Sequence, residues 1–281
     1  MKKLLIALGL IGIQISCQQS REVDEEPLNR PPNFVVNSDS PLQGARGSLV
    51  SATHVITLSE DELNARFGGS VTARNGIHVY RIEYESVDLN NAPIILSGAA
   101  FIPDNSNGPF PVVALQHGTI SAKANAPSVR PREGILEASQ GFAALAIDYM
   151  GFGSSSQLLH PYLIEESYAV AGVDGLRAIH DFANQRGLTF AGLFLKGYSE
   201  GGYATLAMQK AIELNPAIEL ELASKGLPLI ASAPSAGPHQ LANVATTAVN
   251  GGNANPVYIV KVTGAISSGL LKTSLVGTAT Y

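Results

Sequence analysis

The residues best suited to chemistry form one short motif, Gly197-Tyr198-Ser199-Glu200-Gly201. It matches the pattern Gly-x-Ser-x-Gly, in which a serine hydroxyl stands at a sharp turn between a strand and a helix. Small neighbours are needed there because strand and helix approach each other closely. The first amides of the following helix favour negative charge beside the serine. The motif therefore predicts that Ser199 is a nucleophile.

A strand before the motif and a helix after it are the context that this pattern requires. The apolar run 189–195 predicts the strand, and residues 200–212 predict the helix. This context argues against the alternative that residues 197–201 are a glycine-rich turn that contains a serine by chance.

Two other stretches follow predicted buried strands and carry polar residues. Residues 116–119 read Gln-His-Gly-Thr, and residues 148–155 read Asp-Tyr-Met-Gly-Phe-Gly-Ser-Ser, with His-Pro-Tyr at 160–162. Together with the serine motif, they resemble the α/β-hydrolase family of serine esterases and lipases, near the branch that includes the secretory lipases. The resemblance covers about residues 75–240 and rests on three motifs in the family's order.

The resemblance implies an oxyanion hole built from backbone amides. The implied donors are the amide of Glu200 and one near Gly118 and Thr119, where small residues leave N–H groups free to face a developing oxyanion. His117 is implied to fix this loop and not to act as the base, because the family takes its histidine after the nucleophile.

Three further residues are implied to support the site without reacting. Asp148 resembles the family's structural carboxylate, which pins a loop. Gly197 and Gly201 leave room for the turn around the serine.

The partners of the predicted nucleophile are absent from the family's usual places. The family's triad runs Ser, then Asp or Glu, then His, yet no Asp follows Ser199 and His239 is the only later histidine. His239 lies in a segment that resembles the loop leading into the family's cap, and it stays open as an alternative base. We expect the acid and the histidine beyond Tyr281, in a chain that is truncated within its helical cap.

This expectation has two consequences for the 281-residue chain expressed alone. A serine without a base is a weak nucleophile, so the chain is expected to be nearly inactive. Missing strands would expose an apolar sheet edge, so the chain is also expected to be poorly soluble.

Apolar periodicity predicts an α/β fold with an antiparallel N-terminal hairpin. The resemblance implies a mainly parallel sheet with helices on both faces, the start of a helical cap, and the last strands missing. A capping box at Ser59 and Glu62 predicts a short first helix through Phe67. The other predicted strands are 78–87, 93–102, 111–116, 142–147 and 227–233, and the other predicted helices are 168–182, 238–249 and 256–271.

Composition restricts the class of protein. With 45% apolar residues, 15% charged residues and a net charge of −5, the chain is neither disordered nor a coiled coil, and it lacks the basic footprint of a nucleic-acid partner. One cysteine and six histidines without ligand spacing predict no metal site, and no phosphate loop or other cofactor motif is present.

The N-terminus predicts export. Lys2 and Lys3 precede an apolar run that is too short to span a bilayer, so residues 1–16 read as a signal peptide. Cys17 follows, in a context that resembles a bacterial lipoprotein lipobox, which implies lipidation and a membrane anchor in the cell envelope, or else a periplasmic or secreted protein. Residues 17–48 are predicted to be a disordered tether, 49–235 the hydrolase core, and 236–281 the truncated cap segment.

Together, these features predict a hydrolase of small-molecule or lipid carboxylic esters that works through a Ser199 acyl-enzyme. A peptidase on the same fold and a non-catalytic surface lipoprotein that keeps the fold for binding remain alternatives. A membrane-spanning C-terminus is disfavoured, because Lys261 and Lys272 bracket only ten residues, where a spanning helix needs about 20.

Overall fold

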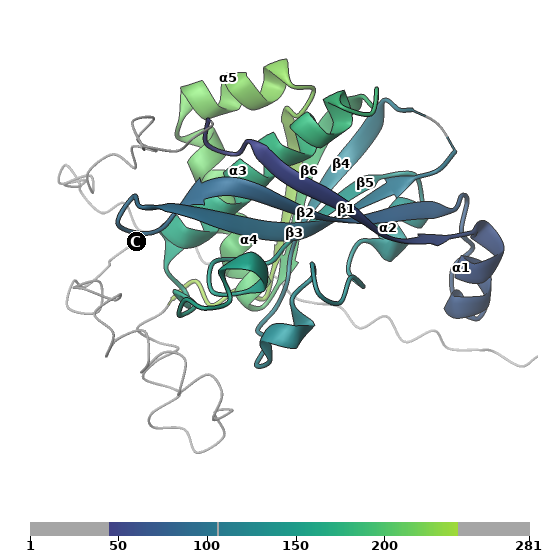
Figure 1. Cartoon of the computed structure of the whole chain (residues 1–281), viewed down its shortest axis with the longest axis horizontal. Helices are drawn as coiled ribbons and strands as arrows, with labels where there is room; N and C mark the ends of the chain where they lie inside the picture. The colour runs from purple at the N-terminus through teal and green to yellow at the C-terminus, as the bar shows by residue number, and fades with distance from the viewer. Residues whose placement is uncertain (1–44, 106, 241–281) are drawn as a thin grey trace, which may run out of the picture. The chain divides into compact units, whose positions relative to one another are not determined.

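One seven-stranded sheet organises the residues that the computed structural model describes, 45–105 and 107–240 (Figure 1). The strands lie in the order β1-β2-β3-β5-β4-β6-β7. Their bounds are β1 (Leu49–Leu58), β2 (Ile77–Val87), β3 (Pro93–Pro103), β4 (Phe110–Gln116), β5 (Ala143–Ile147), β6 (Phe190–Tyr198) and β7 (Leu229–Ser235).

Strand directions confirm the predicted α/β class. Strands β5, β4, β6 and β7 are parallel, whereas β1, β2 and β3 form an antiparallel group whose third member also runs antiparallel to β5. The predicted hairpin is therefore present, and the structure adds β1, which the sequence did not predict. Only Leu58 of this strand is buried, so its apolar pattern is weak.

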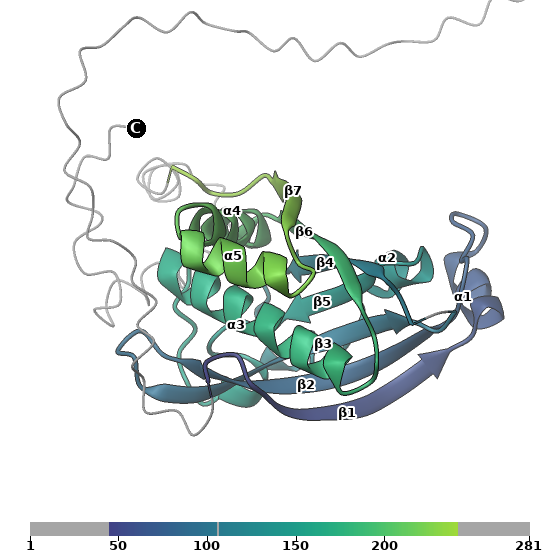
Figure 2. The ribbon, with the colours of Figure 1, turned by 90° about the horizontal axis from the view of Figure 1, so that it is seen from above.

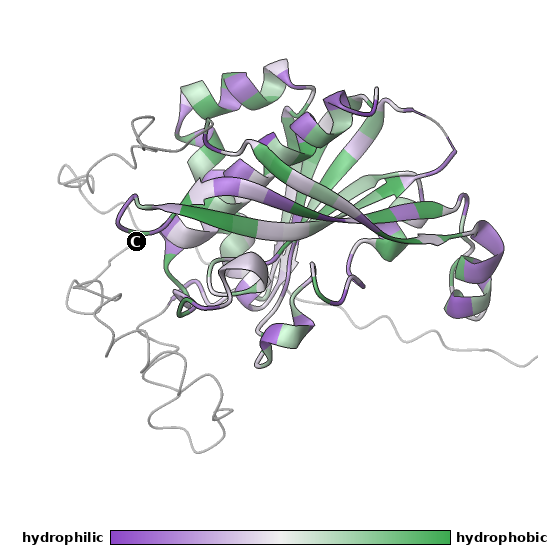
Figure 3. Ribbon diagram, in the orientation of Figure 1, coloured by the Kyte–Doolittle hydropathy of each residue, from purple (hydrophilic) through white to green (hydrophobic). Residues whose placement is uncertain are grey.

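Helices cover both faces of the sheet, as predicted. Their bounds are α1 (Glu60–Phe67), α2 (Ile135–Ser139), α3 (Glu165–Asn184), α4 (Glu200–Glu213) and α5 (Pro216–Ser224). Figure 2 shows α3, α4 and α5 side by side, and their buried residues share one core with the sheet. Buried residues of α1 and α2 belong to a second core on the opposite face. Figure 3 shows apolar residues gathered on the strands, while much of α1 is hydrophilic.

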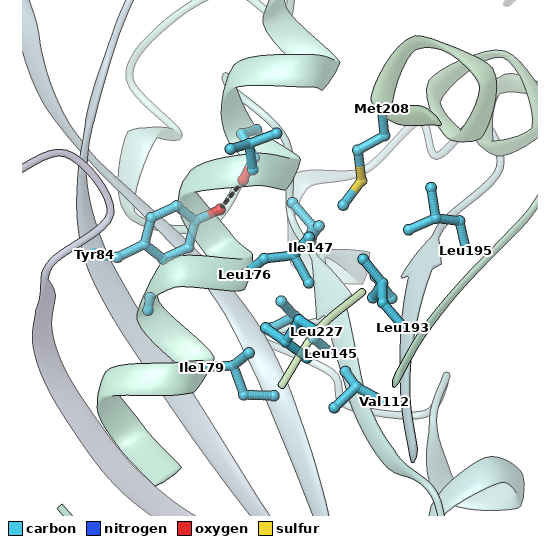
Figure 4. Packing of buried hydrophobic residues seen from close by; sticks show 14 of the residues in the cluster. Tyr84, Val112, Leu145, Ile147, Leu176, Ile179, Leu193, Leu195, Met208 and Leu227 are labelled. Atoms are coloured by element: carbon cyan, nitrogen blue, oxygen red, sulfur yellow. Dashed lines mark hydrogen bonds between the residues drawn. The ribbon is translucent and has the colours of Figure 1, made fainter. Parts of the chain in front are cut away.

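The main core lies between α3, α4 and the sheet. Successive strand residues alternate between the two faces, so Val112 and Ala114 belong to this core, whereas Val113 belongs to the other. Figure 4 shows Leu176 of α3 and Met208 of α4 among the apolar side chains of the strands. The stripe predicted for α3, from Tyr168 to Phe182, is buried throughout: Tyr168, Gly172, Gly175, Ile179 and Phe182.

The ends of two helices follow simple sequence signals. Ser59 and Glu62 form the predicted capping box at the start of α1, with each side chain bonded to the other residue's backbone N–H. The unpredicted helix α5 begins with Asn215 as its N-cap and with Pro216 in its first position. That pair of residues is a recognised start signal and could have revealed the helix.

A buried carboxylate anchors the first described residues. Asp174 of α3 has a fully buried side chain, which accepts hydrogen bonds from Arg46 at 2.9 Å, from Ser86 at 2.7 Å and from Arg177 at 2.8 Å. These donors offset the cost of burying the charge. Tyr84 fixes the same helix by donating to the carbonyl of Ala171 at 2.9 Å (Figure 4).

Strand β7 forms one edge of the sheet in the described part of the chain. Its Ile230 side chain is 59% exposed. Beside it, a groove of about 360 Å³ is lined by residues that include Val113, Phe142 and Phe194. An exposed apolar edge of this kind favours aggregation, which is the basis of the solubility expectation.

Several expectations fall on residues that are not described. Residues 238–240 are not helical, and the rest of the two helices predicted at 238–249 and 256–271 lies outside the described residues, as do the signal peptide and Cys17. Among the helices of residues 45–105 and 107–240, none is long and apolar enough to cross a bilayer.

Candidate active site

Ser199 is the single residue between β6 and α4, and it lies at the tip of a tight turn. Its backbone has φ 58° and ψ −121°, a strained conformation for a residue with a side chain. The N–H of Ser199 donates to the carbonyl of Ser235 in β7 at 2.9 Å, and its carbonyl accepts from the N–H of Tyr203 at 3.2 Å. The turn is thus held on both sides, with a half-buried serine at its tip.

Two glycines make this turn possible. A Cβ on Gly197 would overlap the carbonyl of Gly201, and a Cβ on Gly201 would overlap the carbonyl of Gln116 at the end of β4. The register places Gln116 directly beside Gly197, so the turn after β6 and the loop after β4 meet at the carboxyl edge of the sheet. Only residues without a side chain fit at these two positions.

The loop after β4 lies beside the serine. A Cβ on Gly118 would be 3.3 Å from the carbonyl of Tyr198 and 4.0 Å from the Cβ of Ser199. The N–H groups of Gly118 and Thr119 donate to no acceptor among the described residues. The Thr119 hydroxyl is 2.9 Å from the hydroxyl of Tyr162. The loop after β4 therefore passes beside Ser199 at Gly118.

His117 connects two loops behind this site. Its Nδ1 is 2.8 Å from the carbonyl of Gly118, and its Nε2 is 3.1 Å from the carbonyl of Asp148. The ring lies against that of Tyr149, with centroids 4.1 Å apart, and the Tyr149 hydroxyl donates to the His117 carbonyl at 3.0 Å. Both ring nitrogens are thereby engaged away from Ser199.

Asp148 is buried at the end of β5. Its carboxylate accepts from the Ser97 hydroxyl at 2.5 Å and from the N–H of Ser128 at 2.8 Å. Burial raises the pKa of the Asp148 carboxyl, while the hydrogen bonds from Ser128 and Ser97 act in the opposite direction. These contacts join β3, β5 and the loop at residue 128, and none of them involves Ser199.

The side chain of Glu200 makes contacts that the sequence did not predict. Its Oε1 is 2.7 Å from Nε2 of His160 and accepts from the Tyr168 hydroxyl at 3.0 Å. The sequence assigns a role only to the backbone amide of Glu200. No local spacing signals a contact between residues 40 positions apart.

Comparisons with known proteins identify the fold of the chain. No protein-family model matches the chain, and no curated protein matches it. Among solved structures, the rice cell wall degrading esterase LipA from Xanthomonas oryzae aligns with a TM-score of 0.65 and 27% identity over 73% of this chain. The chain has the α/β-hydrolase fold.

Two other α/β-hydrolase structures agree with this assignment. A hydrolase of Legionella pneumophila, named only as putative, aligns over 82% of the chain with a TM-score of 0.69 and 22% identity. Candida antarctica lipase A aligns over 83% with a TM-score of 0.55 and 17% identity. The chain spans about half the length of LipA (54%), 62% of the Legionella hydrolase and 51% of the lipase.

In this fold, the loops after β4 and β6 bring most of the predicted site residues to one edge of the sheet. Gly118 lies beside Ser199, Thr119 follows Gly118, and Glu200 follows Ser199 in the chain. The ring of the alternative base, His239, stacks on that of Tyr203, with centroids 6.5 Å apart. Among residues 45–105 and 107–240, no histidine is hydrogen bonded to the Ser199 hydroxyl, and no group of three or more metal-ligating side chains occurs.

Proposed function

We propose that this α/β-hydrolase cleaves carboxylic esters through an acyl-enzyme on Ser199. The observation that carries the proposal is the strained Ser199 backbone at the strand-to-helix turn, beside the loop of Gly118 and Thr119. An ester substrate is favoured because LipA is named as an esterase and the Candida protein as a lipase.

The chemistry follows from the arrangement. The Ser199 oxygen attacks the ester carbonyl carbon, and the carbonyl electrons move to the oxygen. Amides of Glu200 and of the loop at Thr119 receive this oxyanion, where one donor is worth about 10²–10³ in rate. A base takes the Ser199 proton and gives it to the departing alkoxide. Water then attacks the acyl-enzyme, releases the acid and restores Ser199.

The base is expected outside the described residues, because no described histidine is bonded to Ser199. Loss of triad function leaves a serine hydrolase only about 10³–10⁴-fold faster than water. We therefore propose that residues 1–281 by themselves hydrolyse esters slowly. Activity is therefore measured on the product of the complete gene.

Substrate assays test the proposed reaction. The gene product should hydrolyse short-chain p-nitrophenyl esters and leave peptide p-nitroanilides almost untouched, and a fluorophosphonate should stop the reaction. Faster cleavage of the anilides would favour a peptidase. Neither hydrolysis nor fluorophosphonate labelling would favour a binding lipoprotein.

A further inference from the structure

A buried pair, His160 and Glu200, meets at the first turn of α4. His160 lies in the loop after β5, and Glu200 is the first residue of the helix. Their side chains are 9% and 0% exposed, and Nε2 lies 2.7 Å from Oε1. The ester reaction as described above uses only the backbone amide of Glu200, so the role of this carboxylate is unassigned.

The hydrogen bonds around His160 and Glu200 indicate which atoms of the two side chains carry protons. Nδ1 of His160 is 2.8 Å from the carbonyl of Met150, which can only accept, so Nδ1 carries a hydrogen. The Tyr168 hydroxyl accepts from the N–H of Leu163 at 2.9 Å and donates to Glu200 at 3.0 Å. Burial raises the pKa of Tyr168, which keeps this hydroxyl protonated.

One more proton then belongs between Nε2 and Oε1. Without it, two lone pairs would face each other across 2.7 Å. With it, the pair is either an imidazolium with a carboxylate or an imidazole with a carboxylic acid, and in both forms its net charge is zero. Aromatic rings lie close around His160: Tyr149, Phe152, Tyr162 and Tyr168, with centroids 4.8–6.0 Å from it.

The charge on Glu200 affects the proposed reaction because this residue lies at the oxyanion hole. Glu200 supplies one of the amides assigned to the oxyanion, and a bare carboxylate on the same residue would oppose the negative charge that develops there. Burial strengthens this repulsion, because little water is present to screen it. A proton shared with His160 removes it, and the bond from His160 to Glu200 ties the start of α4 to the loop after β5.

We propose that His160 is a positioning residue for the oxyanion hole: it shares one proton with Glu200, cancels the carboxylate charge and fixes the first turn of α4. The inference rests on the proposed ester hydrolysis and extends it to a pair that touches no substrate. It predicts that His160 matters through charge, and not only through packing.

Two variants distinguish an effect of the Glu200 charge on activity from an effect of side-chain packing. H160Q removes the imidazole that shares a proton with Glu200, whereas H160Q/E200Q places two neutral amides in the same space. A charge effect predicts that the second substitution restores activity. A packing effect predicts that kcat of the double variant is as low as that of H160Q, or lower.

The experiment compares kcat and KM for a p-nitrophenyl ester in the complete gene product, with the folded fraction measured by circular dichroism. H160Q should lower kcat by about 10–100-fold with KM changed by less than about twofold. H160Q/E200Q should regain at least about fivefold of the loss. H54Q, in exposed β1, is the matched control and should equal the wild type.

An H160Q variant with wild-type kcat, or a double variant no better than H160Q, would overturn the inference. S199A distinguishes this failure from failure of the proposed function: if S199A is as active as the wild type, the ester mechanism itself is wrong. If H160Q does not fold, the double variant decides, because a folded double variant within about tenfold of wild-type kcat supports charge cancellation. An unfolded or inactive double variant opposes it.

Discussion

Replacing Ser199 with alanine should lower kcat for a p-nitrophenyl ester by about 10⁶-fold in the complete gene product. The substitution removes the only atom that forms the acyl-enzyme. The amides of Glu200 and of the loop at Thr119 remain, so about 10³–10⁴-fold acceleration over water should persist. KM should change little, because the hydroxyl contributes mainly after substrate has bound.

Ser224→Ala is the matched control for this prediction. Ser224 ends α5, is exposed and bonds only to the carbonyl of Glu221, so its loss should leave kcat unchanged. Steady-state rates and circular dichroism on both variants make the comparison. A kcat for S199A within about tenfold of the wild type would contradict the assignment of Ser199.

Replacing Asp174 with alanine should destabilise the protein by about 3–5 kcal/mol. The Asp174 side chain is fully buried, and it accepts from Arg46, Ser86 and Arg177. Removing it leaves two guanidinium groups, exposed by only 7% and 14%, without their shared partner. A loss of this size is a large share of the 5–15 kcal/mol that holds an ordinary protein folded.

Urea unfolding, followed by circular dichroism, measures this loss. Asp61→Ala is the control, because Asp61 is exposed in the first turn of α1 and should cost less than about 1 kcal/mol. If Asp174→Ala does not fold, Asp174→Asn keeps the shape and should still be less stable than the control. An Asp174→Ala protein as stable as Asp61→Ala would show that the cluster contributes little.

The sequence predicted those parts of the fold that depend on local patterns. The turn around Ser199 needs a strand, two glycines and a helix in immediate succession, and all of these are visible in one short stretch. The buried stripe of α3 and the capping box of α1 are local in the same way. Strand β1 escaped prediction because most of its residues are exposed, and α2 because it has only five residues.

The polar contacts behind the site depend on tertiary structure. His160 meets Glu200 only because the loop after β5 and the start of α4 reach the same edge of the sheet. Arg46 meets Asp174 across 128 positions. Neither contact has a characteristic spacing, so no reading of one sequence could have predicted it.

Covalent labelling tests the central claim, that Ser199 is the nucleophile, most directly. The complete gene product is treated with a fluorophosphonate, digested and examined by mass spectrometry to locate the adduct. We expect one phosphonate on Ser199, with ester hydrolysis lost in proportion to labelling. An adduct on a different residue, or hydrolysis that persists while Ser199 is fully labelled, would contradict it.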